Sequence, residues 1–533
     1  MGRQEAADVS EAGDSGMVPA EKAEPTAARG RRRLGHAAPR LLQSVPPGIL
    51  RNSLAPVEPL SQDQLMTLHQ ASLRLLEEIG IEFMGAAARQ AFRTAGAEVD
   101  EATGLVRIPR GLVDQALASA PASFSLTPRN PARALAVGGN HVAFGLVAGP
   151  PNIHDCVKGR RSGNYADYVT LIKLAQSFDI IHFLGNQPTA PIELPAETRH
   201  LDCYLANVTY ADRVYHCSAI GRDRALDGID VMAIARGKTR EELIGDPSVI
   251  TIISVNSPRR FDEAMSDGLM AMSEFGQAVV VTPFTLMGAM TPVTLAAALT
   301  QQNAEALAGI VLTQLTRPGA PVVYGAFTSN VDMHSGAPAF GTPENARATL
   351  AAGQFARLYK LPYRASNASA SNVVDAQAAY ESEMSIWSSV MGHANLVYHG
   401  AGWMEGGLTA SFEKIVLDVE MLQMMAQVIQ PIDVSPDEIA LDAIAAVETG
   451  GHFFGAPHTL ARYRTAFYQP LVSNWQNYEN WEIAGALDAT QRATKIWQQA
   501  LQEYQQPPLD PAIAEELQAF AARRRQELTG RGQ

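Results

Sequence analysis

The sequence predicts an α/β protein built on a (β/α)8 barrel, the TIM barrel, with an N-terminal helical region and a C-terminal helical extension. Between residues 141 and 410, eight short apolar or β-branched runs alternate with longer helical patterns. Most of the runs are nearly continuously apolar, as expected for parallel strands that are covered on both faces. Eight strand–helix units in one chain are typical of this barrel. The predicted strands are 141–147, 180–184, 214–219, 249–255, 278–284, 321–326, 362–366 and 395–399.

Composition and pattern divide the chain into four predicted parts. These are a disordered leader (1–55), an N-terminal helical and mixed region (56–140), the barrel (141–410) and the C-terminal helical extension (411–533). The leader is rich in Ala, Gly, Pro, Arg and Glu and has no hydrophobic period. Ser61 and Gln64 form a capping box that predicts the first helix. In the extension, 411–428 and 488–501 are predicted to be helical.

A doubly wound open sheet is the structural alternative to the barrel. Gly400, Gly402 and Gly406 follow the last predicted strand, but their spacing is GxGxxxG and not the GxGxxG of dinucleotide-binding folds. They also lie at the wrong end of the domain for such a fingerprint. The glycines are better explained as shaping a wide loop.

Charge and hydropathy exclude two classes of partner. The formal net charge of the 533 residues is -13, which opposes binding to phosphate backbones, so no nucleic acid is expected. No stretch of about 18 purely apolar residues occurs, so no membrane span is predicted.

The sequence also predicts a cytoplasmic location. The three cysteines, Cys156, Cys203 and Cys217, are spaced too irregularly for a disulfide framework or a structural zinc site. The arginines from 31 to 33 resemble an export signal, but the expected apolar segment does not follow them.

In a barrel, the reacting groups lie at the carboxyl ends of the strands, because the loops after the strands build that face. Residues at these predicted ends are mainly neutral amides and aromatics, and paired carboxylates are scarce. This pattern argues against a hydrolase that works through two acids and against a Mg²⁺ site. The candidate catalytic residues are His399, Glu405, Asn367 and Gln377, and the candidate substrate-binding residues are Phe284, Tyr324, Phe327, His334, Trp403 and Asn256.

Aromatic side chains around an apolar cavity suit a quaternary ammonium ion, because ring faces attract a cation by about 0.5–2 kcal/mol per contact. Phe284, Tyr324, Phe327 and Trp403 are candidates for such a cage, and packing in the core or in a loop is the alternative for each. The position of Trp403, in a Gly-flanked loop just past a strand, favours a binding role for this residue. Glu405 either balances a cation or is a solvated loop carboxylate.

No metal site is predicted. His393 and His399 flank the predicted eighth strand at its two ends, and His452 and His458 lie in a loop. Neither pair has the i,i+4 helical spacing of zinc ligands, and no G-x-S-x-G serine motif occurs. Asp375, at the start of a predicted helix, is explained more simply as a cap.

Several local runs resemble the trimethylamine methyltransferase (MttB-like) family over roughly residues 60–505. The runs are 321–333, Asp375-Ala376-Gln377 with Glu381, His399-Gly400-Ala401-Gly402, Gly450-Gly451-His452-Phe453-Phe454 with His458-Thr459, and Trp481 with Gly485. The resemblance implies a (β/α)8 barrel that passes a methyl group from a methylated amine to the cobalt of a separate corrinoid protein. The corrinoid (cobalamin) would be carried by that partner, docked over the carboxyl face, and this chain would bind no cofactor tightly.

The trimethylamine enzymes of this family carry pyrrolysine in the barrel, and this sequence has none. The resemblance therefore implies a non-pyrrolysine member that acts on a small quaternary amine such as glycine betaine. A quaternary nitrogen is already a leaving group, so positioning and desolvation suffice for catalysis. Two alternatives stay open: demethylation of another betaine or a methylated thioether, and a non-catalytic homologue that binds quaternary amines. Monomer and homo-oligomer are both open.

Overall fold

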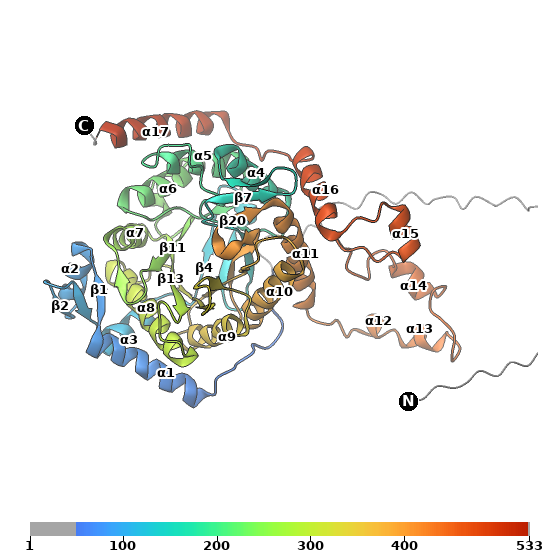
Figure 1. Cartoon of the computed structure of the whole chain (residues 1–533), viewed down its shortest axis with the longest axis horizontal. Coiled ribbons are helices and arrows are strands. Elements are labelled where there is room, and N and C mark those ends of the chain that lie inside the picture. The colour runs from blue at the N-terminus through green and yellow to red at the C-terminus, as the bar shows by residue number, and fades with distance from the viewer. Residues whose placement is uncertain (1–49, 531–533) are drawn as a thin grey trace, which may run out of the picture. The chain divides into compact units, whose positions relative to one another are not determined.

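The computed structural model describes residues 50–530, which Figure 1 colours along the chain. Most of the predicted leader therefore lies outside the described residues. Leu50 is buried, and the side-chain amide of Asn52 donates to the carbonyl of Val390 at 2.8 Å. The packed chain thus begins before residue 56.

All eight predicted strands form, because runs of apolar and β-branched residues pack well when both faces of a strand are covered. They are β6 (Ala143–Leu146), β9 (Phe183–Leu184), β10 (Val214–Tyr215), β11 (Ile250–Val255), β13 (Ala278–Met287), β14 (Val322–Gly325), β17 (Tyr363–Ser366) and β18 (Leu396–Ala401). The largest difference is at β10, which ends at Tyr215 although the prediction ran to residue 219.

These strands are hydrogen-bonded in parallel to their neighbours, in the order β10, β9, β6, β18, β17, β14, β13 and β11. His216, directly after β10, forms a parallel bridge with Ile250 at the start of β11. This bridge links the two ends of the strand order. The predicted α/β fold is thus observed.

One long helix follows each of these strands. The helices are α4 (Tyr165–Ser177), α5 (Arg199–Tyr210), α6 (Arg222–Ala235), α7 (Glu263–Glu274), α8 (Leu295–Thr316), α9 (Pro343–Leu358), α10 (Ala376–Met391) and α11 (Phe412–Val428). In Figure 1 they lie around the strands in chain order, from α4 and α5 at the top through α8 and α9 to α11. Helix α11 was predicted as the start of the C-terminal extension, but it packs on β18.

Two apolar clusters form because the strands are buried on both sides. The larger one includes the side chains between strands and helices. The smaller one takes side chains from every one of the eight strands except β17, and Val280 and Tyr398 are examples. The hairpin of β4 (Ser123–Leu126) and β5 (Leu135–Gly138) adds Leu126 and Leu135 to this cluster, next to the amino ends of the strands. The interior is therefore filled at its amino end.

The N-terminal region packs on α8 through α1 (Gln62–Arg74), α2 (Ala86–Thr94) and α3 (Arg110–Ser119). The predicted capping box is present: the hydroxyl of Ser61 accepts from the backbone N–H of Gln64, whose side chain accepts from the backbone N–H of Ser61. A small sheet lies beside these helices, formed by β1 (Ile81–Phe83), β2 (Glu98–Asp100), β3 (Leu105–Arg107) and β12 (Arg260–Phe261).

The C-terminal extension has two different parts. Helix α16 (Ala489–Gln502) packs on α11 and α4, and α17 (Pro511–Gly530) packs on α5 and α6. Residues 430–487, which we call the arm, contain only short helices, and Figure 1 shows them projecting to one side. These are α12 (Pro436–Ile439), α13 (Leu441–Ala445), α14 (Pro457–Arg462) and α15 (Tyr478–Ile483). Within the arm, Val472 is the one buried residue.

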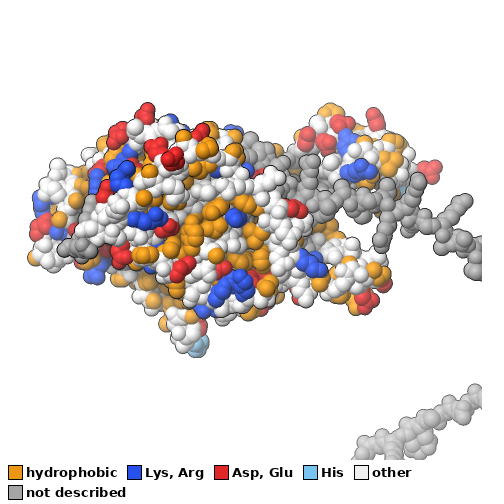
Figure 2. Space-filling model, turned by 90° about the horizontal axis from the view of Figure 1, so that it is seen from above, with side chains coloured by type: hydrophobic (Ala, Val, Ile, Leu, Met, Phe, Trp, Pro, Cys, Tyr) orange, Lys and Arg blue, Asp and Glu red, His pale blue; other side chains and the backbone are white. Residues whose placement is uncertain are grey.

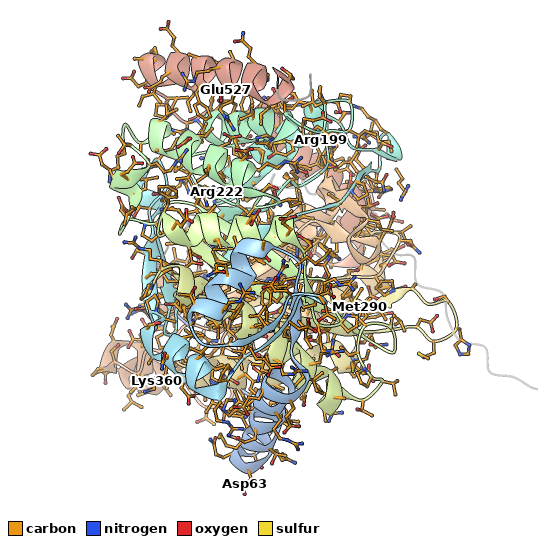
Figure 3. All side chains as sticks on the ribbon, turned by 90° about the vertical axis from the view of Figure 1, so that its left-hand side faces the viewer. Asp63, Arg199, Arg222, Met290, Lys360 and Glu527 are labelled. Atoms are coloured by element: carbon orange, nitrogen blue, oxygen red, sulfur yellow. The ribbon has the colours of Figure 1, made fainter. Side chains whose placement is uncertain are left out.

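The surface and the ends of the strands give the setting of the site. On the face shown in Figure 2, acidic and basic side chains are interspersed with hydrophobic ones. In the side view of Figure 3, Met290, after β13, and Lys360, before β17, lie on opposite sides. The carboxyl and amino ends of the strands thus open towards different sets of loops. Among the described helices, none is both long enough and apolar enough to cross a membrane.

Candidate functional site

A cavity of about 330 Å³ lies at the carboxyl ends of the parallel strands. Strands β11, β13, β17 and β18 and the segments that follow the strands supply its walls. Its chemically distinctive side chains are His216, Phe284, Phe327, Arg364, His399 and Trp403. No Asp or Glu stands among the described residues that line it. The cavity is thus aromatic and cationic.

Aromatic rings form one wall of this cavity. The ring centroid of Phe327 lies 5.2 Å from that of Phe284, 5.3 Å from that of Phe340 and 5.9 Å from that of Trp403. The first pair is tilted, the second stacked and the third edge-to-face, and such pairs at these distances are favourable arrangements of aromatic quadrupoles. Gly407 fits closely against Trp403, since a Cβ on Gly407 would lie 2.5 Å from the indole. The surrounding packing thus fixes the orientation of the tryptophan.

His399 reaches the cavity through an irregularity at the end of β18. Its φ is +54°, and the pairing of β18 with β6 shifts register between Val397 and Ala401. The imidazole Nδ1 accepts a hydrogen bond from the backbone N–H of Ala148 at 3.2 Å, and the ring centroid lies 4.0 Å from that of Trp403. Burial, with help from the charge of Arg364, holds the pKa of His399 well below its ordinary value. The ring is therefore neutral near pH 7.

Arg364 is a buried cation in the wall of the cavity. It lies on β17, is 1% exposed, and places its guanidinium carbon 5.1 Å from the ring centroid of Phe327 and 5.0 Å from that of Tyr398. Its Nη1 donates to the carbonyl of Ala326 at 3.2 Å, whereas its Nε has no hydrogen-bond partner. Burial lowers the pKa of Arg364 to about 10, so the guanidinium stays charged at neutral pH.

A buried polar network holds the backbone next to His399. The carboxylate of Asp418 on α11 accepts from the N–H of Gly402 at 2.8 Å and pairs with Lys414, one turn earlier. Lys414 also donates to the hydroxyl of Ser382 on α10 at 2.6 Å. The side-chain amide of Asn367 donates to the carbonyl of Gly400 at 3.0 Å. The chain between His399 and Trp403 is thus anchored from two helices and one strand end.

The buried histidines make stability depend on pH. Burial lowers the pKa of His182 and of His216 from 6.5 to about 3 each, and it also holds the pKa of His399 well below 6.5. The stability from neutral rings is therefore fully present above pH 6.5 and is lost as the pH falls towards the folded pKa values. Each ring costs about 1.4 kcal/mol per pH unit in that range. Between pH 7.5 and 5.5, the free energy of unfolding should fall by about 4 kcal/mol for the three together.

Urea unfolding at several pH values measures this slope. Replacing His182 with Gln should reduce the slope by about one third, because one ring no longer titrates. Replacing the exposed His334 with Ala is the control and should leave the slope unchanged. A slope that does not respond to His182→Gln would contradict the assignment.

Four of the ten predicted site residues line the cavity: Phe284, Phe327, His399 and Trp403. Asn367 is buried nearby and bonds to backbone. Tyr324, predicted for the cage, lies away from the cavity, because its hydroxyl meets Asn303 on α8 at 2.9 Å.

The other four predicted residues lie outside the cavity lining. The carboxylate of Glu405 pairs with Arg160 at 3.0 Å. Gln377 is exposed on α10 and donates to Glu381 at 2.8 Å. His334 and Asn256 are exposed in loops.

Sequence reasoning missed Arg364 as a site residue. One signal was present: it is the charged residue inside an otherwise uncharged predicted strand, 362–366. A charge within a strand that is buried on both faces has a partner or a function. His216 stood at a predicted strand end and was not chosen.

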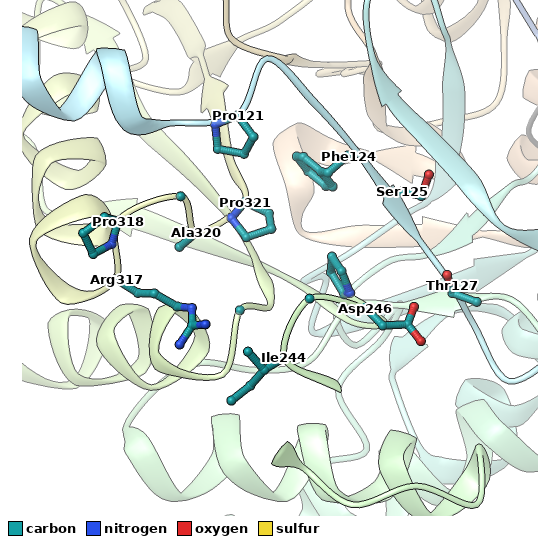
Figure 4. Close-up of a pocket in the computed structure, with 14 residues that line it drawn as sticks. Pro121, Phe124, Ser125, Thr127, Ile244, Asp246, Arg317, Pro318, Ala320 and Pro321 are labelled. Carbon is teal, nitrogen blue, oxygen red and sulfur yellow. The ribbon is translucent and has the colours of Figure 1, made fainter. Parts of the chain in front are cut away.

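A larger cavity, of about 600 Å³, lies at the amino ends of the strands (Figure 4). Pro121, Phe124, Ile244 and Pro321 contribute apolar surface to it, and Arg317 and Asp246 stand apart in it. It has neither the aromatic wall nor the buried unpaired cation of the cavity at the carboxyl ends. Active sites of α/β folds with parallel strands lie at the carboxyl ends, so the smaller cavity is the candidate site.

No group of three or more His, Cys, Asp or Glu among residues 50–530 is arranged to hold a metal ion. The distinctive groups of the cavity are its aromatic rings and the buried guanidinium of Arg364.

Comparison with known proteins places these features in context. Residues 26–529 match the family model described as trimethylamine methyltransferase (MTTB). The chain is 36% identical to a glycine betaine methyltransferase of Desulfitobacterium hafniense (strain Y51), over 88% of this chain and 97% of the relative. It is 30% identical to the trimethylamine methyltransferase MttB of D. hafniense (strain DSM 10664 / DCB-2), over 90% and 97%. Among solved structures, the Methanosarcina barkeri monomethylamine methyltransferase (MtmB) matches with a TM-score of 0.48 at 10% identity, covering 88% of this chain and 90% of that one.

Proposed function

The chain belongs to the trimethylamine methyltransferase family, and from that premise we propose that it moves a methyl group from a quaternary amine to the cobalt of a corrinoid protein. Glycine betaine is the first substrate we propose, in keeping with the relative that is named for it. The corrinoid belongs to the partner, which docks over the carboxyl ends of the strands. On this proposal the chain itself binds no cofactor tightly.

We place the site in a (β/α)8 barrel formed by the eight parallel strands and the eight helices that follow them. The first strand, β6, pairs with the last, β18, and the bridge from His216 to Ile250 joins the other two ends of the strand order. An open doubly wound sheet would instead leave two edge strands. The proposed barrel runs from β6 to the end of α11, so it ends at Val428 and not at residue 410.

One observation carries the proposal: the cavity is lined by aromatic rings and by no carboxylate. Ring faces attract a trimethylammonium group without fixing the position of any one methyl by hydrogen bonds. A small, mostly apolar cavity also removes water from the reacting carbon. Phe284, Phe327 and Trp403 are the rings that we assign to this role.

The proposed reaction needs no general acid or general base. The C–N bond breaks with its electron pair retained by nitrogen, which leaves as a neutral tertiary amine. The methyl carbon is taken by the nucleophile that the corrinoid partner supplies. No proton is transferred, so the neutral His399 and the absence of a lining carboxylate fit the reaction. The chain contributes positioning and exclusion of water.

Methyl transfer to free cob(I)alamin tests this function. The decrease in cob(I)alamin absorbance is followed with glycine betaine, choline, trimethylamine and a dimethylated thioether as donors. Glycine betaine should react, and the His334→Ala variant, altered in an exposed loop outside the cavity, should match the wild type. Transfer from the thioether alone would favour that alternative substrate class. Tight binding of glycine betaine without turnover, with the corrinoid partner present, would favour a non-catalytic homologue.

We further propose that the chain forms a homo-oligomer through the arm (430–487). Helices of four to six residues are not stable by themselves and need a surface to pack on. The arm exposes large apolar side chains, including Ile432, Leu441, Phe454, Phe467, Trp475 and Ile483. They offer on the order of 1,000 Å² per chain, as much as a stable interface needs. A permanent second copy fits this need better than a corrinoid partner that must dissociate.

Light scattering after size-exclusion chromatography checks the oligomer. The wild type should run as an oligomer, and the triple variant Phe454→Ser/Phe467→Ser/Ile483→Ser should shift to monomer. The matched control is Glu448→Ser/Glu479→Ser/Glu482→Ser, which changes the same segment without removing apolar surface. A monomeric wild type would refute the proposal.

We also propose that the protein is cytoplasmic. Cys156, Cys203 and Cys217 are free thiols, and free thiols are usual in reducing compartments.

A further inference from the structure

The side chain of Arg364 lies on the interior face of β17, the face from which the other seven strands supply apolar side chains to the smaller cluster. Strand β17 is the one of the eight that contributes nothing to the smaller apolar cluster. In the register of β14 and β17, Arg364 pairs with Gly325, whereas Tyr363 pairs with Tyr324. Tyr324 and Tyr363 bond to helices α8 and α9, so Gly325 and Arg364 belong to the opposite, interior side of the strands. Gly325 leaves no side chain of its own beside the guanidinium.

The guanidinium lacks the acceptors that a buried arginine requires. It forms no ion pair with any Asp or Glu among residues 50–530, and its Nε is without a partner. The Nη2 lies 3.3 Å from Nε2 of His399, but the Nδ1 of that ring already accepts from Ala148. A neutral imidazole has one acceptor nitrogen, so Nε2 carries the proton and cannot accept from Arg364. The guanidinium of Arg364 therefore has one hydrogen-bond acceptor among the described residues, the carbonyl of Ala326.

Burying an unpaired cation is costly, so a group that remains unpaired in the free protein points to a ligand. The matching ligand group is a carboxylate, because the fork of a guanidinium bonds both of its oxygens. Arg364 also contacts the face of Phe327, and Phe327 packs against Phe284 and Trp403. The ring of Phe327 would therefore lie between an anion bound to Arg364 and a cation held by the other rings of the aromatic wall.

We propose that Arg364 binds the carboxylate of the substrate, so that the site accepts zwitterions in which a short spacer joins a carboxylate to a quaternary nitrogen. This inference rests on the proposed function and names its substrate class. The same guanidinium repels a cation that brings no negative charge, and the repulsion is strong because the cavity has no acid to offset it. Choline and tetramethylammonium carry the same methylated head and should bind poorly. The carboxylate thus decides which quaternary amine enters.

Isothermal titration calorimetry of the full chain distinguishes the contribution of the carboxylate to the binding affinity from that of the quaternary nitrogen. Wild type should bind glycine betaine at least about 30-fold more tightly than choline or glycine betaine methyl ester, which lack the negative charge. In the Arg364→Gln variant, the affinity for glycine betaine should fall on the order of 100-fold, while that for choline should hold or rise. Arg364→Lys keeps the charge but loses the fork, and should recover only part of the affinity. Circular dichroism and the melting temperature report whether the variants fold.

The comparison of ligands on the wild type keeps the inference testable if Arg364→Gln does not fold. Wild type that binds choline or the ester as tightly as glycine betaine would overturn it. So would an Arg364→Gln variant that folds and loses affinity for both ligands equally. Methyl transfer from choline in preference to glycine betaine would contradict the proposed role of Arg364, but it would agree with the methyltransferase proposal. No binding of any methylated amine would overturn both.

Discussion

Replacement of Lys414 with Met should lower the free energy of unfolding by about 3–5 kcal/mol, the usual cost of breaking a buried ion pair. The Lys414 and Asp418 side chains are 1% and 0% exposed, so both charges are shielded from the solvent. Burial already raises the pKa of Asp418, and the charge of Lys414 opposes that rise. Without the ammonium, the carboxylate must either stay charged in an apolar setting or take up a proton, and both cost stability.

Urea unfolding at pH 7.5 measures the effect, and the chain offers a matched control. Arg74 and Glu78 form another i,i+4 pair, but their side chains are 66% and 58% exposed. Arg74→Met should therefore cost no more than about 0.5 kcal/mol. A second variant, Lys414→Met/Asp418→Asn, removes both charges and should regain part of the loss. Equal effects at the two pairs would show that the buried pair has no special role.

Replacement of Trp403 with Leu should lower kcat/KM for a quaternary amine by about 30-fold, because a desolvated contact with an indole contributes about 2 kcal/mol. Trp403→Phe keeps a ring face and should lose less. Trp387→Leu, on the outer side of α10 at 38% exposure, is the control and should leave kcat/KM unchanged. The readout is methyl transfer to cob(I)alamin at several donor concentrations.

A glycine variant tests the same ring without altering it. A Cβ at Gly407 would lie 2.5 Å from the indole, so Gly407→Ala should displace Trp403 and lower kcat/KM to a similar extent. Gly407 also has a φ of +100°, which by itself strains an alanine. Gly450→Ala separates the two causes, since Gly450 has a φ of +82° but nothing within 4 Å of its Cβ position. If Trp403→Leu and Trp387→Leu gave the same kcat/KM, the aromatic wall would have no role in binding.

Much of the fold was readable from local sequence. The apolar runs marked all eight strands, and Ser61 with Gln64 marked the start of the first helix, because periodicity and capping depend on neighbours within a few residues. Helix α11 was assigned to the C-terminal extension, since nothing in 411–428 tells that it packs on β18. The site was partly readable, since the end of a strand is a local feature, and Phe284, His399 and Trp403 follow from it.

The sequence by itself thus determined which segments are strands and helices and which aromatic residues follow the strands. The tertiary structure alone decided which of those side chains meet. Tyr324 and Arg364 lie in similar strands, but the register turns one towards α8 and the other towards the interior. A positive φ at His399 lets it reach the cavity beside Tyr398, against the alternation of a regular strand. Glu405 pairs with Arg160, 245 positions earlier, and contacts between such distant residues are set by packing and not by local pattern.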